Sequence, residues 1–202
     1  MKTNVHSIRW TLLVATIATS GCSTSVSSYS IPLSNVEAFK ALRGAKVSVS
    51  AFTSVELSRS GGLACGAGTI QMPANEPYEA YVRAALVDEL KVARLYSADA
   101  PAQIKGHLAH VAFTSARPPR WELALIVTIG HVPPFKLERK YAFDVQLLIG
   151  QPPIASIAGD CARTARAFLP AVQDLMSALA RDPRFAKALA STTPASDATP
   201  PK

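Results

Sequence analysis

Residues whose types and spacing could perform catalysis or hold a metal are few in this chain. His107 and His110 lie three residues apart on an expected strand, which places them on opposite faces and keeps them from sharing a metal ion. The sequence contains neither the zinc motif His-Glu-x-x-His nor the nucleophile motif Gly-x-Ser-x-Gly. Its acidic residues form no close pair, so Glu56, Glu122 and Glu138 are interpreted as solvated side chains. We therefore expect no metal, no cofactor and no catalytic residue, and a protein that is not an enzyme.

The chemistry that the sequence does offer is that of cysteine, beginning with Cys22. Residues 1–10 carry Lys2 and Arg9 and no acid, and the following segment is apolar or small up to Ala18. A short basic region, a short apolar region and small residues are typical of a secretory signal peptide, which we assign to residues 1–21. The apolar stretch is shorter than the roughly 20 residues that a membrane-spanning helix requires.

The stretch Thr19-Ser20-Gly21-Cys22 resembles the lipobox of bacterial lipoproteins, although that family usually has leucine where Thr19 stands. The resemblance implies that the signal is cut before Cys22 and that Cys22 carries fatty acids such as palmitate, which hold the protein on a membrane. Ser23 stands where an aspartate would retain such a lipoprotein in the inner membrane, so the resemblance implies the periplasmic face of the outer membrane. The alternative is an ordinary secretory signal followed by Cys22 as a free thiol.

The two remaining cysteines suggest a disulfide bond. An exported protein folds in an oxidising compartment, and with Cys22 acylated only Cys65 and Cys161 are left to pair. We predict a bond between them. It would close a loop of about 100 residues, which in the chain-entropy description stabilises the folded chain by roughly 4–5 kcal/mol. A metal site or a redox pair would be expected at shorter cysteine spacing.

The composition predicts one folded domain without a nucleic-acid partner. The chain has 202 residues, of which 49% are hydrophobic and 17% are charged, a balance typical of a globular protein. The net charge is +7, but the basic residues are scattered and form no run of five. We therefore exclude a nucleic-acid-binding tract.

The elements that must position these residues follow from the periodicity of the apolar side chains. Strands are expected over residues 46–53, 104–114, 121–129 and 141–149. A short helix or a turn is expected within residues 31–44, and a helix from an Asn75 cap to Tyr96. The main helix near the end of the chain is expected from about Pro170, and Asp182-Pro183 either ends it or restarts a short helix to Leu189. The glycine-rich stretch Arg59–Gly68 lacks the lysine of a phosphate-binding loop and is interpreted as a flexible loop held by Cys65.

The order strand, helix, three strands, helix predicts an α+β fold. We expect a two-layer sandwich in which a four-stranded, mainly antiparallel sheet is covered by two amphipathic helices, all within one domain over residues 36–190. Residues 22–35 are rich in serine and threonine and are expected to form a solvated tether, and residues 191–202 a disordered tail. Phe135, in the proline-rich link Gly130–Arg139, is the candidate contact with a membrane or partner, but its ring could equally fold back onto the sheet.

The lipobox and this order of elements together resemble small envelope lipoproteins of Gram-negative bacteria, over Lys46–Leu189 in topology only. The LPS-assembly lipoprotein and the auxiliary lipoproteins of ABC-type lipid transport have a similar order. The resemblance implies a membrane-anchored, non-enzymatic periplasmic lipoprotein that supports envelope assembly or transport through a protein or lipid partner. Two alternatives stay open: a small periplasmic hydrolase or lipid-binding enzyme with an unrecognised site, and a purely structural or stress-response lipoprotein.

Overall fold

The computed structural model describes residues 23–42, 44–55, 62–66, 68–115, 118–144 and 153–192, with the backbone alone for residues 153–159. The expected signal peptide, Cys22 and most of the expected tail lie outside these ranges. The elements in chain order are β1 (Ser23–Ser25), α1 (Leu33–Lys40), β2 (Ser48–Val49), β3 (Thr53–Ser54), β4 (Leu63–Cys65), β5 (Gly68–Gln71), a short 3-10 turn (Pro73–Asn75), α2 (Tyr78–Val92), β6 (Gln103–Thr114), β7 (Arg120–Ile129), β8 (Phe135–Ala142), α3 (Pro153–Arg181) and α4 (Pro183–Ser191).

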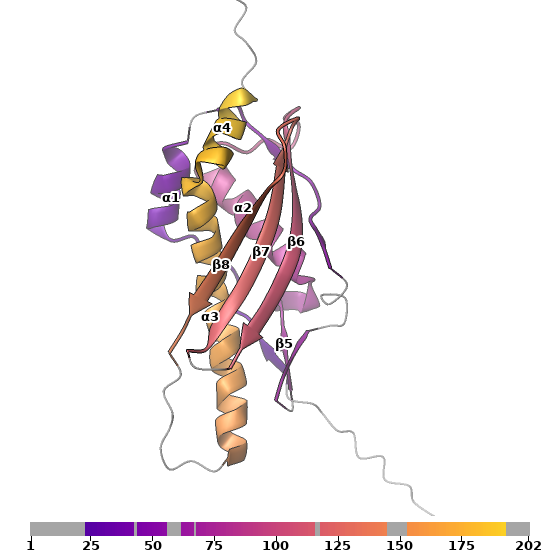
Figure 1. Ribbon diagram of the computed structural model, residues 1–202, viewed down its shortest axis with the longest axis vertical. Helices are drawn as coiled ribbons and strands as arrows, with labels where there is room; N and C mark the ends of the chain where they lie inside the picture. Colours follow the sequence, from indigo (N-terminus) through magenta and orange to yellow (C-terminus); the bar gives the residue numbers. More distant parts are fainter. Residues whose placement is uncertain are drawn as a thin grey trace, which may run out of the picture.

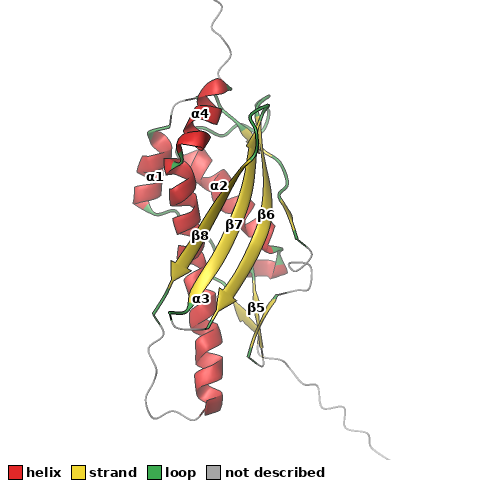
Figure 2. Ribbon diagram, viewed as in Figure 1, coloured by secondary structure: helices red, strands yellow, loops and turns green. Residues whose placement is uncertain are grey.

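Three long antiparallel strands, β6, β7 and β8, form most of the main sheet, and the helices cover one of its faces (Figure 1). Figure 2 shows the two layers, with the strands in yellow in front of the helices in red. The face of β7 that the alternation predicted is confirmed, because every second residue from Trp121 to Ile129 is at most 2% exposed. The indole of Trp121 is satisfied in the core, where its Nε1 donates to the carbonyl of Thr164 at 2.8 Å.

The α+β class is confirmed, but the expected single four-stranded antiparallel sheet is wrong. Within the described ranges, the main sheet has five strands, because β2 and β3 both pair with β6 in parallel, and β1, β5 and β4 form a second sheet of three strands. The chain between β2 and β6 includes α2, and such a crossover brings the next strand back in the same direction. The single strand expected at residues 46–53 is split, since Ala51 is exposed and Phe52 is buried, which breaks the alternation.

The last strand and the last long helix both begin earlier than expected. β8 starts at Phe135, which pairs with Val127 across a short turn, so the second half of the proline-rich link, residues 135–139, belongs to the strand. Most of the expected strand 141–149 therefore lies beyond β8, and residues 145–149 lie outside the described ranges. α3 starts at Pro153 and contains Pro170, although an internal proline costs a helix about 3 kcal/mol. Phe168 and Val172, both fully buried, lie on either side of Pro170, and burying such side chains offsets that cost at about 1.5–3 kcal/mol each.

The N-terminal cap of α4 agrees with the sequence prediction, and that of α2 does not. Asp182 caps α4, its carboxylate accepting from the backbone N–H of Arg184 at 2.8 Å, which confirms the expected restart after α3. The expected Asn75 cap of α2 is wrong: Pro77 precedes the helix without a side-chain bond, and Asn75 ends the 3-10 turn at a φ of 57°. α1 confirms the short helix expected within residues 31–44.

The segment that follows Cys22 is packed against the domain, so the tether expected over residues 22–35 is wrong for its described part. β1 pairs in parallel with β5, and the N–H of Val26 donates to the carbonyl of Gln71 at 2.8 Å. Val26 is 3% exposed. Further along, the hydroxyl of Tyr29 donates to the buried carboxylate of Glu89 in α2 at 2.6 Å. The described part of this segment, residues 23–35, therefore belongs to the folded domain that was expected to start at residue 36.

A disulfide bond joins the second sheet to α3, as predicted. Cys65 at the end of β4 and Cys161 in α3 have their Cα atoms 5.6 Å apart and their sulfur atoms 2.12 Å apart. The flexible loop expected at Arg59–Gly68 is wrong for its described part, since Leu63–Cys65 pairs with Gly68–Ile70 in an antiparallel hairpin.

Among the helices in the described ranges, none combines the length and apolarity needed to cross a bilayer.

Candidate functional site

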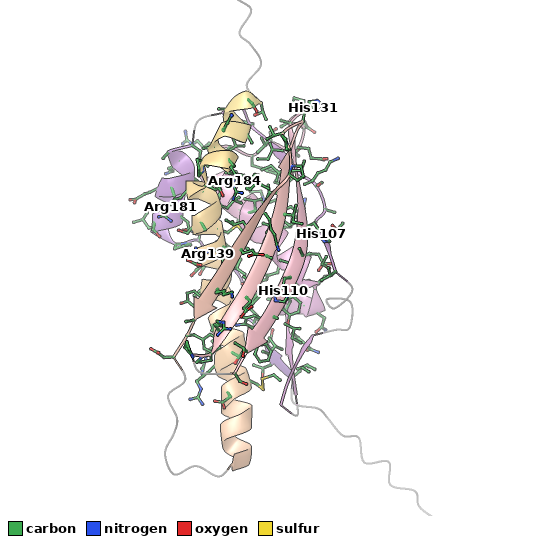
Figure 3. All side chains as sticks on the ribbon, viewed as in Figure 1. His107, His110, His131, Arg139, Arg181 and Arg184 are labelled. Atoms are coloured by element: carbon green, nitrogen blue, oxygen red, sulfur yellow. A yellow bond between two sulfur atoms is a disulfide. The ribbon has the colours of Figure 1, made fainter. Side chains whose placement is uncertain are left out.

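A β-bulge in β6 brings His107 and His110 to the same face of the main sheet. The register of β6 against β7 shifts between Leu108 and His110, so the side chains no longer alternate across Ala109. Leu108 and Val111 are buried on the helix side, which leaves both histidines on the opposite, solvent-facing side, here called the outer face (Figure 3). The expectation of opposite faces is therefore wrong, because it assumed an unbroken period of two.

The outer face carries charged side chains that form ion pairs with one another. Glu122 accepts from Arg120 at 2.7 Å, and Glu138 forms an ion pair with Lys136. These hydrogen bonds, aided by neighbouring cations, lower the pKa of both carboxyl groups, so the acids stay ionised and are poorly suited to donate a proton. Within the described residues, no group of three or more histidine, cysteine or acidic side chains is placed to hold a metal ion.

A groove of about 1120 Å³ lies at the end of the main sheet, between the β7–β8 turn and α4. We call this groove the distal groove, because it lies at the end of the molecule opposite to the second sheet (Figure 1). Its apolar wall consists of Ile129, Val132, Pro133, Pro134 and Phe135, and its polar side chains include His131, Lys136, Arg184, Lys187, Ser191 and Thr192.

The β7–β8 turn is shaped to stand out from the sheet as one wall of this groove. Gly130 adopts a φ of 53°, a left-handed conformation in which a side chain would be strained, and a Cβ there would meet nothing within 4 Å. Glycine at this position is therefore explained by backbone conformation and not by crowding. The turn continues through two prolines, whose fixed φ stiffens the wall before pairing resumes at Phe135.

Phe135 forms the floor of the groove and is not the exposed contact that the sequence suggested. Its side chain is 8% exposed, and the guanidinium of Arg184 lies over its ring, 4.8 Å from the centroid. Of the two possibilities left open, the structure has the ring folded back, so a partner would reach it only through the groove.

The guanidinium of Arg184 is held in place by the first residues around α4. Its Nε and Nη2 donate to the carboxylate of Asp182, at 3.0 and 2.6 Å, and Nη2 also donates to the carbonyl of Lys136 at 3.3 Å. The hydrogen bond with Arg184 lowers the pKa of Asp182 and raises the pKa of Arg184, so both groups stay charged. Nη1 donates to no group among the described residues, which leaves two N–H groups for a ligand in the groove.

The lining of the distal groove is basic. Among the residues that the structure describes, the lining includes Lys136, Arg184, Lys187 and His131 but no aspartate or glutamate. Two of these cations form ion pairs with acids that are not part of the lining: Lys136 with Glu138 on the outer face, and Arg184 with Asp182 at the start of α4. The arrangement can therefore bind one or two anionic groups beside an apolar surface, which is the chemistry of recognition.

Sequence reasoning brought attention to Phe135 but missed the cations that surround it. The pair Asp182-Pro183 predicts a helix boundary, but it gives no sign that the N-cap carboxylate also binds the guanidinium of Arg184 two residues later. The approach of α4 to the β7–β8 turn joins residues 48 apart in the chain, and no local pattern announces it.

Comparison with known proteins supports the fold and leaves the activity open. No family model and no curated protein matches the sequence. The crystal structure of protein XCC0632 from Xanthomonas campestris, described as belonging to the family DUF330, matches with a TM-score of 0.51 over 82% of this chain and 95% of its own, at 9% identity. A second structure, described as an uncharacterized protein, matches at 9% identity with a TM-score of 0.36, over 75% of this chain and 97% of its own. The chain is thus similar in fold to a DUF330 protein.

Proposed function

We propose that this protein is a non-enzymatic lipoprotein, held on the periplasmic face of the outer membrane through acylated Cys22, that supports envelope assembly or transport by binding a protein or lipid partner. The observation that carries the proposal is the distal groove, whose basic side chains and apolar wall form a recognition surface. This groove lies at the end of the molecule opposite to β5 (Figure 1), the strand with which Ser23, the residue after Cys22, is paired.

The packing of β1 supports an orienting role for the anchor. Because Ser23 is already paired with Thr69 of β5, acyl chains on Cys22 would be joined to the folded domain with no intervening linker. Multiple acyl chains give a durable anchor at about 0.8 kcal/mol per buried methylene. An anchor without a linker keeps the second sheet beside the bilayer and leaves the distal groove accessible from the periplasm.

The anchor is tested by labelling cells with radioactive palmitate. The wild-type protein should incorporate the label and fractionate with outer membranes, and Cys22→Ala should lose both properties. If the variant still labels and still fractionates with membranes, the anchor is not at Cys22 and this part of the proposal is wrong.

The binding role is tested by photo-crosslinking in intact cells. A photoreactive residue at exposed His131, in the groove, should capture a specific envelope partner. The same residue at exposed Lys140, on the outer face of β8, is the matched control and should capture that partner weakly or not at all. Equal capture at both positions, or none at His131, would count against the groove as the binding surface.

A further inference from the structure

We infer that the distal groove binds an extended, acidic segment of another polypeptide. A carboxylate of that segment contacts Arg184 and Lys187, and an apolar side chain beside it packs against Phe135 and the Pro133–Pro134 wall. The inference rests on the proposed function and deepens it, since it names the class of partner that the groove recognises.

Charge complementarity is the first reason. Arg184 and Lys187 are three residues apart on α4, so their side chains lie on the same side of the helix, and both are exposed in the groove. Arg184 presents Nη1 from a guanidinium already fixed by Asp182, so little side-chain entropy is lost when a carboxylate binds. The described lining contributes no acid, and the carboxylates of Asp182 and Glu138 are each paired with a cation of the groove.

The shape of the groove favours a peptide over a lipid. The groove is partly open to solvent, so an acyl chain in it would leave many of its methylenes exposed to water and lose the benefit of burying them. An extended peptide alternates its side chains, so one can face the apolar wall while its neighbours stay in water. The groove therefore matches the alternating pattern of an extended chain better than a continuous hydrocarbon.

The position of the groove argues against two other occupants. The ten residues of β7 run from the end near β5 up to the groove, about 33 Å at 3.3 Å per residue. That distance is several times the Debye length of about 8 Å, so the headgroups around acylated Cys22 would be screened from it. A second copy of the chain from Cys22 onward is electrostatically a poor ligand for a basic groove, because it keeps a net charge of +5 after the +7 of the full chain loses Lys2 and Arg9.

The test uses the full acylated protein, purified from membranes into detergent, and a fluorescein-labelled peptide of alternating glutamate and valine. Fluorescence anisotropy should show binding that Lys187→Gln weakens by about tenfold, the loss expected for one charge-assisted contact. Lys140→Gln, the matched control on the outer face, should leave the affinity unchanged. Lys187 is exposed, so its substitution should not disturb the fold, and thermal unfolding of both variants checks this.

Three outcomes would overturn the inference: no binding of the glutamate–valine peptide, equal binding of a lysine–valine peptide, or equal losses in both variants. Preferential binding of phosphatidylglycerol vesicles over the acidic peptide would also overturn it, in favour of a lipid ligand. The results are separable from the proposed function. Groove crosslinking to a partner without peptide binding would refute only the inference, whereas peptide binding by a protein that proves not to be acylated would refute only the anchor.

Discussion

Removal of the Cys65–Cys161 bond should cost this domain a large part of its stability. The two cysteines are separated by 96 residues, so the bond closes a long loop in the unfolded chain. The chain-entropy relation for a loop of this length predicts a loss of about 4.7 kcal/mol at 25 °C. A domain of this size has a free energy of unfolding of about 5–15 kcal/mol, so the loss would bring it close to the threshold of folding.

Urea unfolding of the chain from Ser23 onward, which lacks Cys22 and its thiol, measures the effect. The double variant Cys65→Ala/Cys161→Ala should unfold at lower urea with a free energy reduced by about 3–5 kcal/mol. Its m-value should rise, because an unfolded chain without the cross-link exposes more surface. The wild-type chain in dithiothreitol should behave like the double variant, and the double variant should not respond to dithiothreitol.

Two results would contradict the stabilising role of the Cys65–Cys161 bond or its existence. If dithiothreitol produces two free thiols in the wild-type chain while the urea midpoint and the m-value stay the same, the bond does not constrain the unfolded chain as argued. Two reactive thiols in the unreduced, denatured chain would show that the bond is absent.

Three further changes test the core, the cap and a buried charge. Burial raises the pKa of Glu89, so the stability of the wild-type protein should fall as pH rises above about 4.3. Urea midpoints measured across pH should show this fall in the wild type but not in Glu89→Gln. Parallel pH profiles of the two proteins would refute the role of Glu89. Gly106→Ala should lower stability by about 1–3 kcal/mol in urea unfolding, because its Cβ would lie 2.5 Å from the Phe52 ring; an unchanged midpoint would show that the ring moves freely. Asp182→Ala should cost about 1 kcal/mol of stability at neutral pH through the lost α4 cap. Because hydrogen bonding with Arg184 lowers the pKa of Asp182, the difference from wild type should be present above about pH 3.9 and vanish as pH falls through the lowered value; a difference that persists in acid would contradict this.

The elements that sequence patterns predicted well are those whose signal is local and repeated. β7 alternates strictly from Trp121 to Ile129, and α2 repeats apolar residues at helical spacing, so each element indicates its own buried face. α4 has an aspartate cap followed by proline, a second local signal. These patterns were sufficient for the α+β class and for the covered face of the main sheet.

The features that were missed depend on contacts between distant parts of the chain. The serine and threonine residues of β1 do not by themselves predict a strand. The strand forms because Ser23 pairs with Thr69 of β5, and the stability of a strand depends on the strand beside it. The bulge at Ala109 has no glycine or other local marker, yet it reverses the side on which His110 lies. The distal groove depends on the approach of α4 to the β7–β8 turn, so its cations could not be grouped from the sequence alone.

The packing of β1 also changes what an anchor at Cys22 would do mechanically. A flexible tether would isolate the domain from movements of the bilayer, but β1 passes any pull on Cys22 directly to its parallel pairing with β5. Val26 is buried in the core and Tyr29 is hydrogen-bonded to buried Glu89, so displacing the segment would expose apolar surface and remove a partner from a buried carboxylate. Both costs resist displacement. Acyl chains at Cys22 would therefore hold the whole domain in one orientation, with the distal groove at the end directed away from the bilayer.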